Sequence, residues 1–389
     1  MEEKNKTVST AKTTADIEDP SAASTVIKTL DSKKKKLVEE TIEPEYEKIV
    51  ELDFTKDLEK DYSKEKATEL TDTTDEPEKV MAKPFDISSI NVINKNELEK
   101  NKDLVKALSS NKSAFQIVAA QSGYVATVKP LTHKDTVDIL YGNLGRYEYR
   151  LNIFETIWNK IYSTSIGKVS FDDWLKITSV EDIETFYYGV YCATFPNEGT
   201  FNFTCPHCGE ERNCKITHGN LIKTADKKAM RELISKVSRE SDSPMKMKEF
   251  SLVGKMETYQ LSESKIVVEL RTPSLWNSLE LLKKIPEDII DKDTMSVTNM
   301  LYINRILVAN PEGTGYSEYS DRLKLLNIID NLSISDAQEL HNTVFARVNE
   351  NRISYSIKNI KCPSCGKEIN EIPISIEDIL FTLIFEKTQ

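Results

Sequence analysis

The sequence predicts an α+β protein with a mainly helical body, short antiparallel strands and an extended N-terminal arm. Three observations lead to this fold class. Residues 1–83 contain no Gly, Trp, Cys or His, whereas residues 123–389 contain all of them. Within the body, short β-branched runs alternate with longer amphipathic patterns, which indicates strands between helices. Two copies of the motif Cys-Pro-X-Cys-Gly, starting at Cys205 and Cys362, each lie between predicted strands.

Composition limits the classes of function. The chain has 389 residues and a formal net charge of -11, and an acidic surface repels both nucleic acid and anionic membranes. No apolar run approaches the roughly 18 residues that a membrane helix needs. The polar, acidic N-terminus has no apolar core of a signal peptide. We therefore expect synthesis in a reducing cytoplasm, where paired cysteines favour metal binding over disulfides.

The first 122 residues divide into an arm and a bridge. The arm, residues 1–83, has more acidic residues than lysines and few aromatics, so it cannot bury enough apolar surface to fold alone. It is either disordered or an arm that orders on partner proteins. The bridge, residues 84–122, contains one predicted amphipathic helix over 94–108.

A loose internal repeat organises the body. Residues 123–219 and 265–389 each run through a strand, a Pro followed by a capping hydroxyl (Thr132 or Ser274), several helices, a strand, a knuckle and a second strand. Residues 220–264 form a linker with a charged helix. The expected helices are 133–143, 147–164, 170–176 and 179–194 in the first unit and 275–284, 286–292, 295–308, 319–330 and 333–350 in the second.

The two knuckles predict a two-knuckle zinc ribbon with one structural zinc ion. Zinc favours four thiolates in closed structural sites, and two cysteines three positions apart can bind one ion from a single tight turn. The expected ligands are Cys205, Cys208, Cys362 and Cys365. Pro after the first cysteine and Gly after the second suit the turn.

A local ligand set is the alternative. Cys205, Cys208, Cys214 and His218 also have metal-like spacing, but this set leaves the second knuckle without a partner. On the preferred interpretation Cys214 and His218 are ordinary residues, His207 is exposed and Cys192 is in the core.

Catalytic patterns are missing from the sequence. Four thiolates would leave no open position for a substrate, and the chain has no HExxH motif, nucleophile elbow, P-loop or GxGxxG motif. His133 and His341 lie singly on predicted helices. The acids over 172–184 are expected to start helices or to face solvent, because acids favour helix N-termini. The protein is predicted not to be an enzyme.

The C-terminal residues 371–386 are unusually apolar and are expected to contain a last helix. It either closes the core or docks on a neighbour through its apolar face, which consists of Ile379, Leu380, Leu383, Ile384 and Phe385.

This pattern resembles the baseplate hub and hub-assembly proteins of contractile-tailed bacteriophages of the T-even type. The resemblance covers roughly residues 123–389 and rests on the Pro-Leu-Thr start, the run from Ile177 to Tyr188, and the two knuckles. It implies structural zinc at the four knuckle cysteines and a place in the virion tail baseplate. It also implies multi-copy assembly with other tail proteins, through the arm and the C-terminal helix.

Two alternatives remain open. One is a hub-assembly chaperone that is absent from the mature particle. The other is a zinc-ribbon module that binds nucleic acid or a transcription complex. The mixed and acidic residues beside both knuckles, such as Glu210 and Glu368, argue against the second.

Overall fold

The computed structural model describes most of the body and two short pieces of the arm. The described residues are 49–50, 68–69, 114–141, 145–195, 199–215, 221–224, 228, 231–233, 250–286, 289–290, 294–313 and 315–388. All of them belong to one compact unit. The predicted bridging helix and the rest of the arm lie outside these residues.

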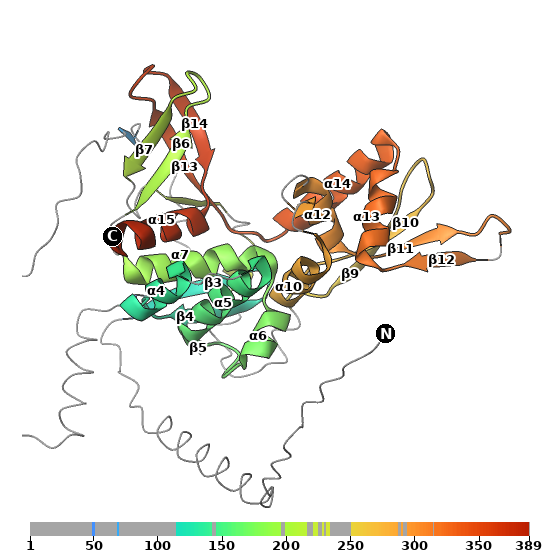
Figure 1. The fold of residues 1–389 in the computed structure, drawn as a ribbon, viewed down its shortest axis with the longest axis horizontal. Coiled ribbons are helices and arrows are strands. Elements are labelled where there is room, and N and C mark those ends of the chain that lie inside the picture. The colour runs from blue at the N-terminus through green and yellow to red at the C-terminus, as the bar shows by residue number, and fades with distance from the viewer. Residues whose placement is uncertain are drawn as a thin grey trace, which may run out of the picture. The chain divides into compact units, whose positions relative to one another are not determined.

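The first half of the body is a small sheet with helices packed on it (Figure 1). Strand order is β1-β3-β4-β5, in which β1 is parallel to β3 and the other pairs are antiparallel. The elements are β1 (Ile49–Val50), β3 (Ala114–Ala119), β4 (Tyr124–Val128), α4 (His133–Tyr141), α5 (Arg146–Asn159), β5 (Ile161–Thr164), α6 (Phe171–Ile177), the 3-10 turn η3 (Val180–Asp182) and α7 (Ile183–Thr194). They are followed by the hairpin β6 (Thr200–Thr204) and β7 (Glu211–Lys215).

The second half repeats this plan around a second antiparallel sheet, with strand order β12-β11-β10-β9. Its elements are β9 (Met256–Gln260), β10 (Val267–Arg271), α10 (Leu275–Lys284), α12 (Thr294–Tyr302), β11 (Ile303–Ala309), β12 (Tyr316–Tyr319), α13 (Arg322–Asp330) and α14 (Ile334–Asn349). They are followed by the hairpin β13 (Ser354–Lys361) and β14 (Glu368–Pro373) and by α15 (Ile376–Thr388). Strands β2 (Thr68–Glu69) and β8 (Ile222–Thr224) pair with β13.

The repeated order of elements extends to local detail. Asp135 donates its backbone N–H to the Thr132 hydroxyl at the start of α4, and Ser274 forms a capping box with Asn277 at the start of α10. Both central strands also have a register shift against the next strand of their sheet, between Thr127 and Val128 and between Glu269 and Leu270. The two halves therefore share a local design as well as an order of elements.

Three predicted boundaries differ from the structure. The body begins with β3 at Ala114, ahead of residue 123. The helices expected over 147–164 and 295–308 end at Asn159 and Tyr302, and each continues as a strand. In both places a β-branched run follows the helix, Ile161-Tyr-Ser-Thr and Ile303-Asn-Arg-Ile-Leu-Val, and pairing with a sheet decides its conformation.

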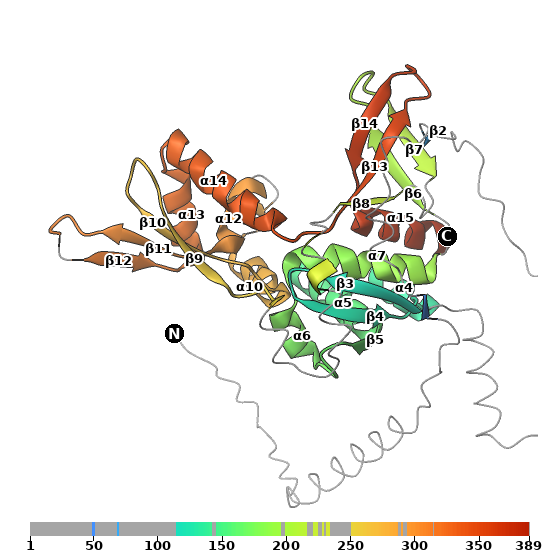
Figure 2. The same ribbon diagram turned by 180° about the vertical axis from the view of Figure 1, so that it is seen from behind.

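Helix α7 is the centre of the first half. All its residues from Thr185 to Ala193 are buried, because β3 and β4 cover one side and α15 covers another (Figures 1 and 2). Tyr188 lies edge-on to Phe115 of β3 and stacks on Tyr355 of β13, with ring centroids 5.8 and 4.9 Å apart. Buried aromatic side chains of one helix thus join the sheet to the second hairpin.

Helix α15 closes this core. Ile379, Leu380, Leu383 and Ile384 are buried, and only Phe385 of the predicted apolar face is largely exposed. The core-closing interpretation is therefore confirmed, and four of the five residues proposed for docking are not accessible. The Arg150 side chain donates to Glu377 of α15 at 2.6 Å, and Glu184 of α7 accepts the Ile376 N–H at 2.9 Å.

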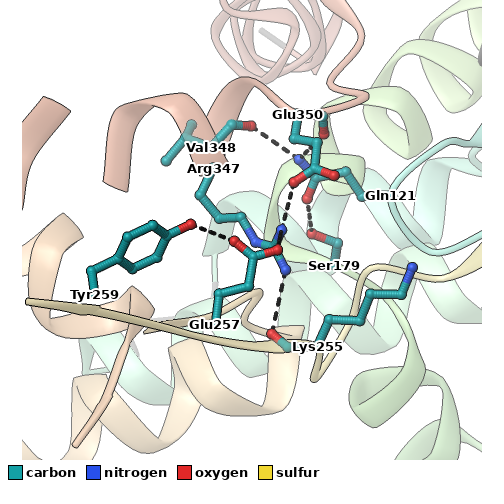
Figure 3. Close-up of polar contacts among 8 residues, drawn as sticks. All are labelled: Gln121, Ser179, Lys255, Glu257, Tyr259, Arg347, Val348 and Glu350. Atoms are coloured by element: carbon teal, nitrogen blue, oxygen red, sulfur yellow. Dashed lines mark hydrogen bonds and ion pairs between the residues drawn. The ribbon is translucent and has the colours of Figure 1, made fainter. Parts of the chain in front are cut away.

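A polar joint connects the two halves (Figure 3). The Gln121 side-chain amide donates to the carbonyl oxygens of Val348 and Glu350, at 3.0 and 2.7 Å, and accepts from the Ser179 hydroxyl. Arg347, which is 6% exposed, donates to Glu257 and Glu350 and to the carbonyl of Lys255.

Two acidic side chains, those of Asp182 and Glu181, also bind residues of this joint. Asp182 is 1% exposed and accepts the N–H groups of Gln121 and Ser122 and the Ser122 hydroxyl. Glu181 accepts from Tyr302 at 2.9 Å and pairs with Arg352 at 3.2 Å. These two acids were expected to start a helix or to face solvent; they do lie at a helix start, but their side chains bind groups of the joint.

We predict that Gly189→Ala destabilises the protein, although alanine normally favours a helix. An added Cβ would lie 2.5 Å from Ile117 Cγ2 and 2.9 Å from Val128 Cγ2, so the helix or the sheet must move. Overpacking of this kind costs about 1–3 kcal/mol. Denaturant unfolding measures the loss. Ile117→Ala removes the first clash, so the double variant should lose less than the sum of the two single variants.

A second prediction concerns pH. Burial raises the pKa of Glu184 from 4.5 to about 7, and the nearby Glu377 and Asp378 carboxylates add to the shift. The folded protein thus binds this proton more tightly than the unfolded chain. The stability contributed by this group is complete below the unfolded pKa and is lost as pH rises toward 7.

Glu184→Gln keeps an acceptor for Ile376 and removes the charge. Its free energy of unfolding, relative to that of the parent protein, should rise by about 1–3 kcal/mol between roughly pH 5 and pH 8. Urea unfolding across this range measures the difference. The control is Glu155→Gln on the exposed surface of α5, and an equal pH profile for both variants would contradict the prediction.

Candidate metal centre

The two knuckles are the tips of two β-hairpins. Cys205 and Cys208 lie between β6 and β7, and Cys362 and Cys365 lie between β13 and β14. Antiparallel pairing continues to the last residues before each turn, with Thr204 opposite Glu211 and Lys361 opposite Glu368. Each hairpin therefore holds its cysteine pair in a short, well-paired turn.

The two turns have the same backbone geometry. In each, the first cysteine donates its N–H to a carbonyl five residues later, Glu210 or Lys367, at 2.9 and 3.0 Å. The glycine after the second cysteine donates back to the first cysteine. Gly209 and Gly366 have φ values of 72° and 68°, a left-handed conformation that favours glycine.

The four sulfur atoms of these turns converge. They all lie within 4.8 Å of one another, and two pairs across the knuckles, Cys205 with Cys365 and Cys208 with Cys362, are 3.9 Å apart. A disulfide would require about 2.05 Å. A tetrahedral ion with four Zn–S bonds of about 2.3 Å places its sulfur atoms about 3.8 Å apart. The donor set and its spacing therefore fit a closed zinc site.

Each knuckle contributes one buried and one exposed cysteine. Cys205 and Cys362 are buried, and Cys208 and Cys365 are exposed. The site is thus half covered by the protein, and the outer thiols mark the side from which an ion can enter.

Electrostatics differ between the Cys362 and Cys208 thiols. The backbone N–H groups of Cys365 and Ser364 lower the pKa of Cys362 to about 6. At Cys208 a backbone hydrogen bond from Glu210 also lowers the pKa, but burial and the neighbouring thiols outweigh it and raise the pKa to about 12. A cation at the centre would favour the thiolate form of all four groups.

Contacts beyond the thiols join the two hairpins. The Ser364 hydroxyl donates to Glu210 at 2.6 Å, and His207 Nε2 lies 3.3 Å from the Glu368 carbonyl oxygen. These contacts are exposed and each is weak alone. Together they hold the two turns in the arrangement in which the thiols meet.

Among the described residues, the cluster consists of the four knuckle cysteines. The backbone of Cys214 pairs with that of Phe201 in the hairpin ladder, three residues after Glu211, the first residue of β7, and so about 10 Å along the strand from the knuckle. His218 lies outside the described residues. His207 is exposed and Cys192 is buried in the core, as expected. The position of Cys214 argues against the local ligand set.

Sequence reasoning missed the buried acids and their partners. Nothing in the local sequence around Glu181, Asp182 and Glu184 distinguishes them from Asp172 and Asp173, which are exposed at the start of α6. Asp182 is buried and the two glutamates are half-buried, because they contact Gln121, Tyr302 and Ile376, which are distant in the sequence. An alignment of related sequences would be the signal that reveals such pairs.

Within the described part of the chain, every helix is too short or too polar to span a bilayer.

Comparison with known proteins gives one match. Residues 112–380 match a family model described as "T4 bacteriophage base plate protein". No curated protein and no solved structure matches the chain. The matched range runs from just before β3 into α15, and so it includes both halves and both knuckles.

Proposed function

Because this chain belongs to the T4 bacteriophage base plate protein family, we propose that it is a non-enzymatic structural component of a phage tail baseplate or its hub. In this role it holds neighbouring tail proteins in place in the virion, and one zinc ion joins its two halves. The observation that carries the proposal is the convergence of four thiols from two hairpins about 150 residues apart, within a body that the family model spans.

The zinc ligands in this proposal are Cys205, Cys208, Cys362 and Cys365. The ion would add a cross-link to the exposed polar contacts that join the two hairpin turns. Structural zinc supplies on the order of 10 kcal/mol of folding free energy, which exceeds what such contacts provide. Its function is to stiffen the body, and partner binding belongs to other surfaces.

A structural function agrees with the surroundings of the titratable groups. Four thiolates leave no open coordination position for substrate. His133 is exposed at the start of α4, and His341 lies beside Phe345, with ring centroids 6.1 Å apart. The carboxylates of Asp182 and Glu181 already bind backbone N–H, hydroxyl and guanidinium groups of the joint.

A nucleic-acid function is less well supported, because the hairpins present mixed charge. Lys361 lies opposite Glu368 and Lys358 lies opposite Glu371, with the second pair 3.7 Å apart. A nucleic-acid surface needs unpaired basic groups along one face.

We predict about one zinc ion per chain, bound by four sulfur atoms at about 2.3 Å. Elemental analysis and X-ray absorption spectroscopy of the purified full chain measure these quantities. Cys362→Ser together with Cys365→Ser should release the ion and lower the melting temperature. The matched control is Cys214→Ser, which should keep it. Metal loss in the control, with retention in the double variant, would favour the local ligand set.

The location in the particle is tested separately. Mass spectrometry of purified virions and of assembly intermediates should detect this protein in both. Detection only in intermediates would replace the structural function by that of a hub-assembly chaperone. A protein missing from both samples would contradict a tail function altogether.

A further inference from the structure

We propose that the outer edge of β9 and the groove between β9 and α14 bind an extended segment of a partner protein that carries lysine or arginine side chains. The segment would add to the sheet as a further strand beside β9. The inference goes beyond the baseplate function and does not depend on it. The residues that line the groove include Glu257, Tyr259, Asn342, Thr343, Ala346 and Asn349.

Strand β9 is paired on one side. It bonds to β10 and ends the sheet on its other side, as far as the described residues show. Leu261 donates its N–H to Ile266, just beyond the last ladder pair, so bonded and non-bonded pairs alternate back along β9. This register points the backbone N–H and C=O groups of Met256, Thr258 and Gln260 away from β10. A row of such groups is a template for another strand.

A groove lies beside this edge. It has a volume of about 610 Å³, opens to solvent, and is lined by residues of β9 and α14. All residues of β9 are exposed, and Figure 3 shows the Glu257 side chain turned from this strand toward Arg347 of α14. Strand addition needs an open edge for backbone hydrogen bonds and a neighbouring pocket for alternate side chains, and both are present here.

Contacts on both sides keep the walls of the groove in place. The inner face of α14 is attached to the second core through Leu340 and Val344, which are buried. Arg347 donates to Glu257 of β9 at 2.8 Å and to Glu350 at 2.6 Å (Figure 3). These contacts hold α14 against β9, so the groove is already formed in the protein alone.

The charge of the groove favours a basic occupant. Glu257 and Glu350 share the single guanidinium of Arg347, so these three side chains carry one net negative charge. The two glutamate side chains are 45% and 42% exposed, whereas that of Arg347 is 6% exposed, so the negative charge lies at the surface. The net charge of -11 acts in the same direction, because an acidic surface attracts a basic partner.

This chain already adds extended segments to its other sheets. Strand β1 pairs with β3 and β2 pairs with β13, and both short strands come from the arm. Strand addition is therefore compatible with the edges of this fold. The arm has more acidic residues than lysines, so the charge of the groove disfavours a further arm segment and favours a different, basic protein at β9.

The two faces of β9 define the side chains that a partner strand needs. Successive side chains of a strand point to opposite faces of the sheet. On the groove face the partner would lie beside Glu257 and Glu350, and on the other face it would lie beside Met256, which is 51% exposed. A segment with lysine at every second position and valine between the lysines fits both faces.

Fluorescence anisotropy with the full chain tests the proposal. The probe is a labelled peptide, Thr-Lys-Val-Lys-Val-Lys-Thr. Its dissociation constant should be on the order of 10–100 µM, because a short strand buries less area than a standard interface. The same peptide with glutamate in place of lysine should bind at least about tenfold more weakly. Failure of the basic peptide to bind overturns the proposal. Equal or tighter binding of the acidic peptide also overturns it and indicates an acidic segment, such as the arm, as the occupant.

Proline substitution separates strand addition from general attraction of charge. Thr258→Pro removes an N–H group that points away from β10, which an edge strand tolerates, and should weaken binding of the basic peptide at least about tenfold. The matched control is Tyr316→Pro on β12, the other edge strand. Asn310 donates to Gly315 there, so the Tyr316 N–H also points out of the sheet, and this variant should bind like the parent protein. Melting temperatures check that both variants fold. Equal affinities of the two variants overturn the proposal.

Charge substitutions test the groove without disturbing the contacts of Arg347. Ala346 is exposed in the groove, so Ala346→Lys should weaken binding of the basic peptide about threefold or more, and Ala346→Glu should strengthen it. The matched controls are Leu323→Lys and Leu323→Glu on α13, where Leu323 is 52% exposed outside the groove. Screening by salt should keep their effects below about twofold. Equal effects at the two positions indicate non-specific attraction and overturn the proposal.

Sedimentation velocity of the parent protein examines a second copy as the occupant. The protein should show no self-association through β9. A dimer that Thr258→Pro abolishes and Tyr316→Pro preserves would mean that the edges of two copies pair with each other, and it would overturn the proposal.

Discussion

Burial of α7 on all sides is the constraint on which the described body depends. From Thr185 to Ala193 the helix has no charged residue, and Gly189 is placed where β3 and β4 approach most closely. This lets the sheet, α15 and β13 contact one helix at the same time. Because both hairpins stand on this core, through Phe201, Phe203, Tyr355 and Ile357, packing of α7 also places the two knuckles beside each other. The apolar contacts beneath the two hairpins thus bring the four thiols at their tips close together.

The local chemistry of the site could be predicted from the sequence, because its determinants are local. A Cys-Pro-X-Cys-Gly turn needs only neighbouring residues to set its shape, and both turns were expected at the tips of hairpins. The capping residues Thr132 and Ser274 could also be predicted, because a helix cap depends only on residues that are close in the sequence. Strands β5 and β11 were not predicted, since Ile161–Thr164 and Ile303–Ala309 become strands only through pairing with β4 and β10. The burial of Asp182 depends on Gln121 and Ser122, about sixty residues away, and no local pattern reports such a contact.

Each half contains an equivalent arrangement of strands and helices, yet the two halves use their last helices differently. In the first half α7 is buried throughout, so it needs aromatic side chains on every face. In the second half α14 is buried on one side only, and its other side is exposed or half-buried.

Helix α14 and the second knuckle are also connected along the chain. Residues 350–353 alone separate α14 from β13, the strand that leads to Cys362. Both ends of the polar joint act on this short segment, since Gln121 holds the Glu350 carbonyl and Glu181 holds Arg352. Positive φ at Asn351 lets the chain turn sharply between these two contacts. The segment is thereby attached to the first half at two points, so a displacement of α14 is opposed by the same core that supports the thiol cluster. The position of α14 and the geometry of the thiol cluster therefore depend on the same core.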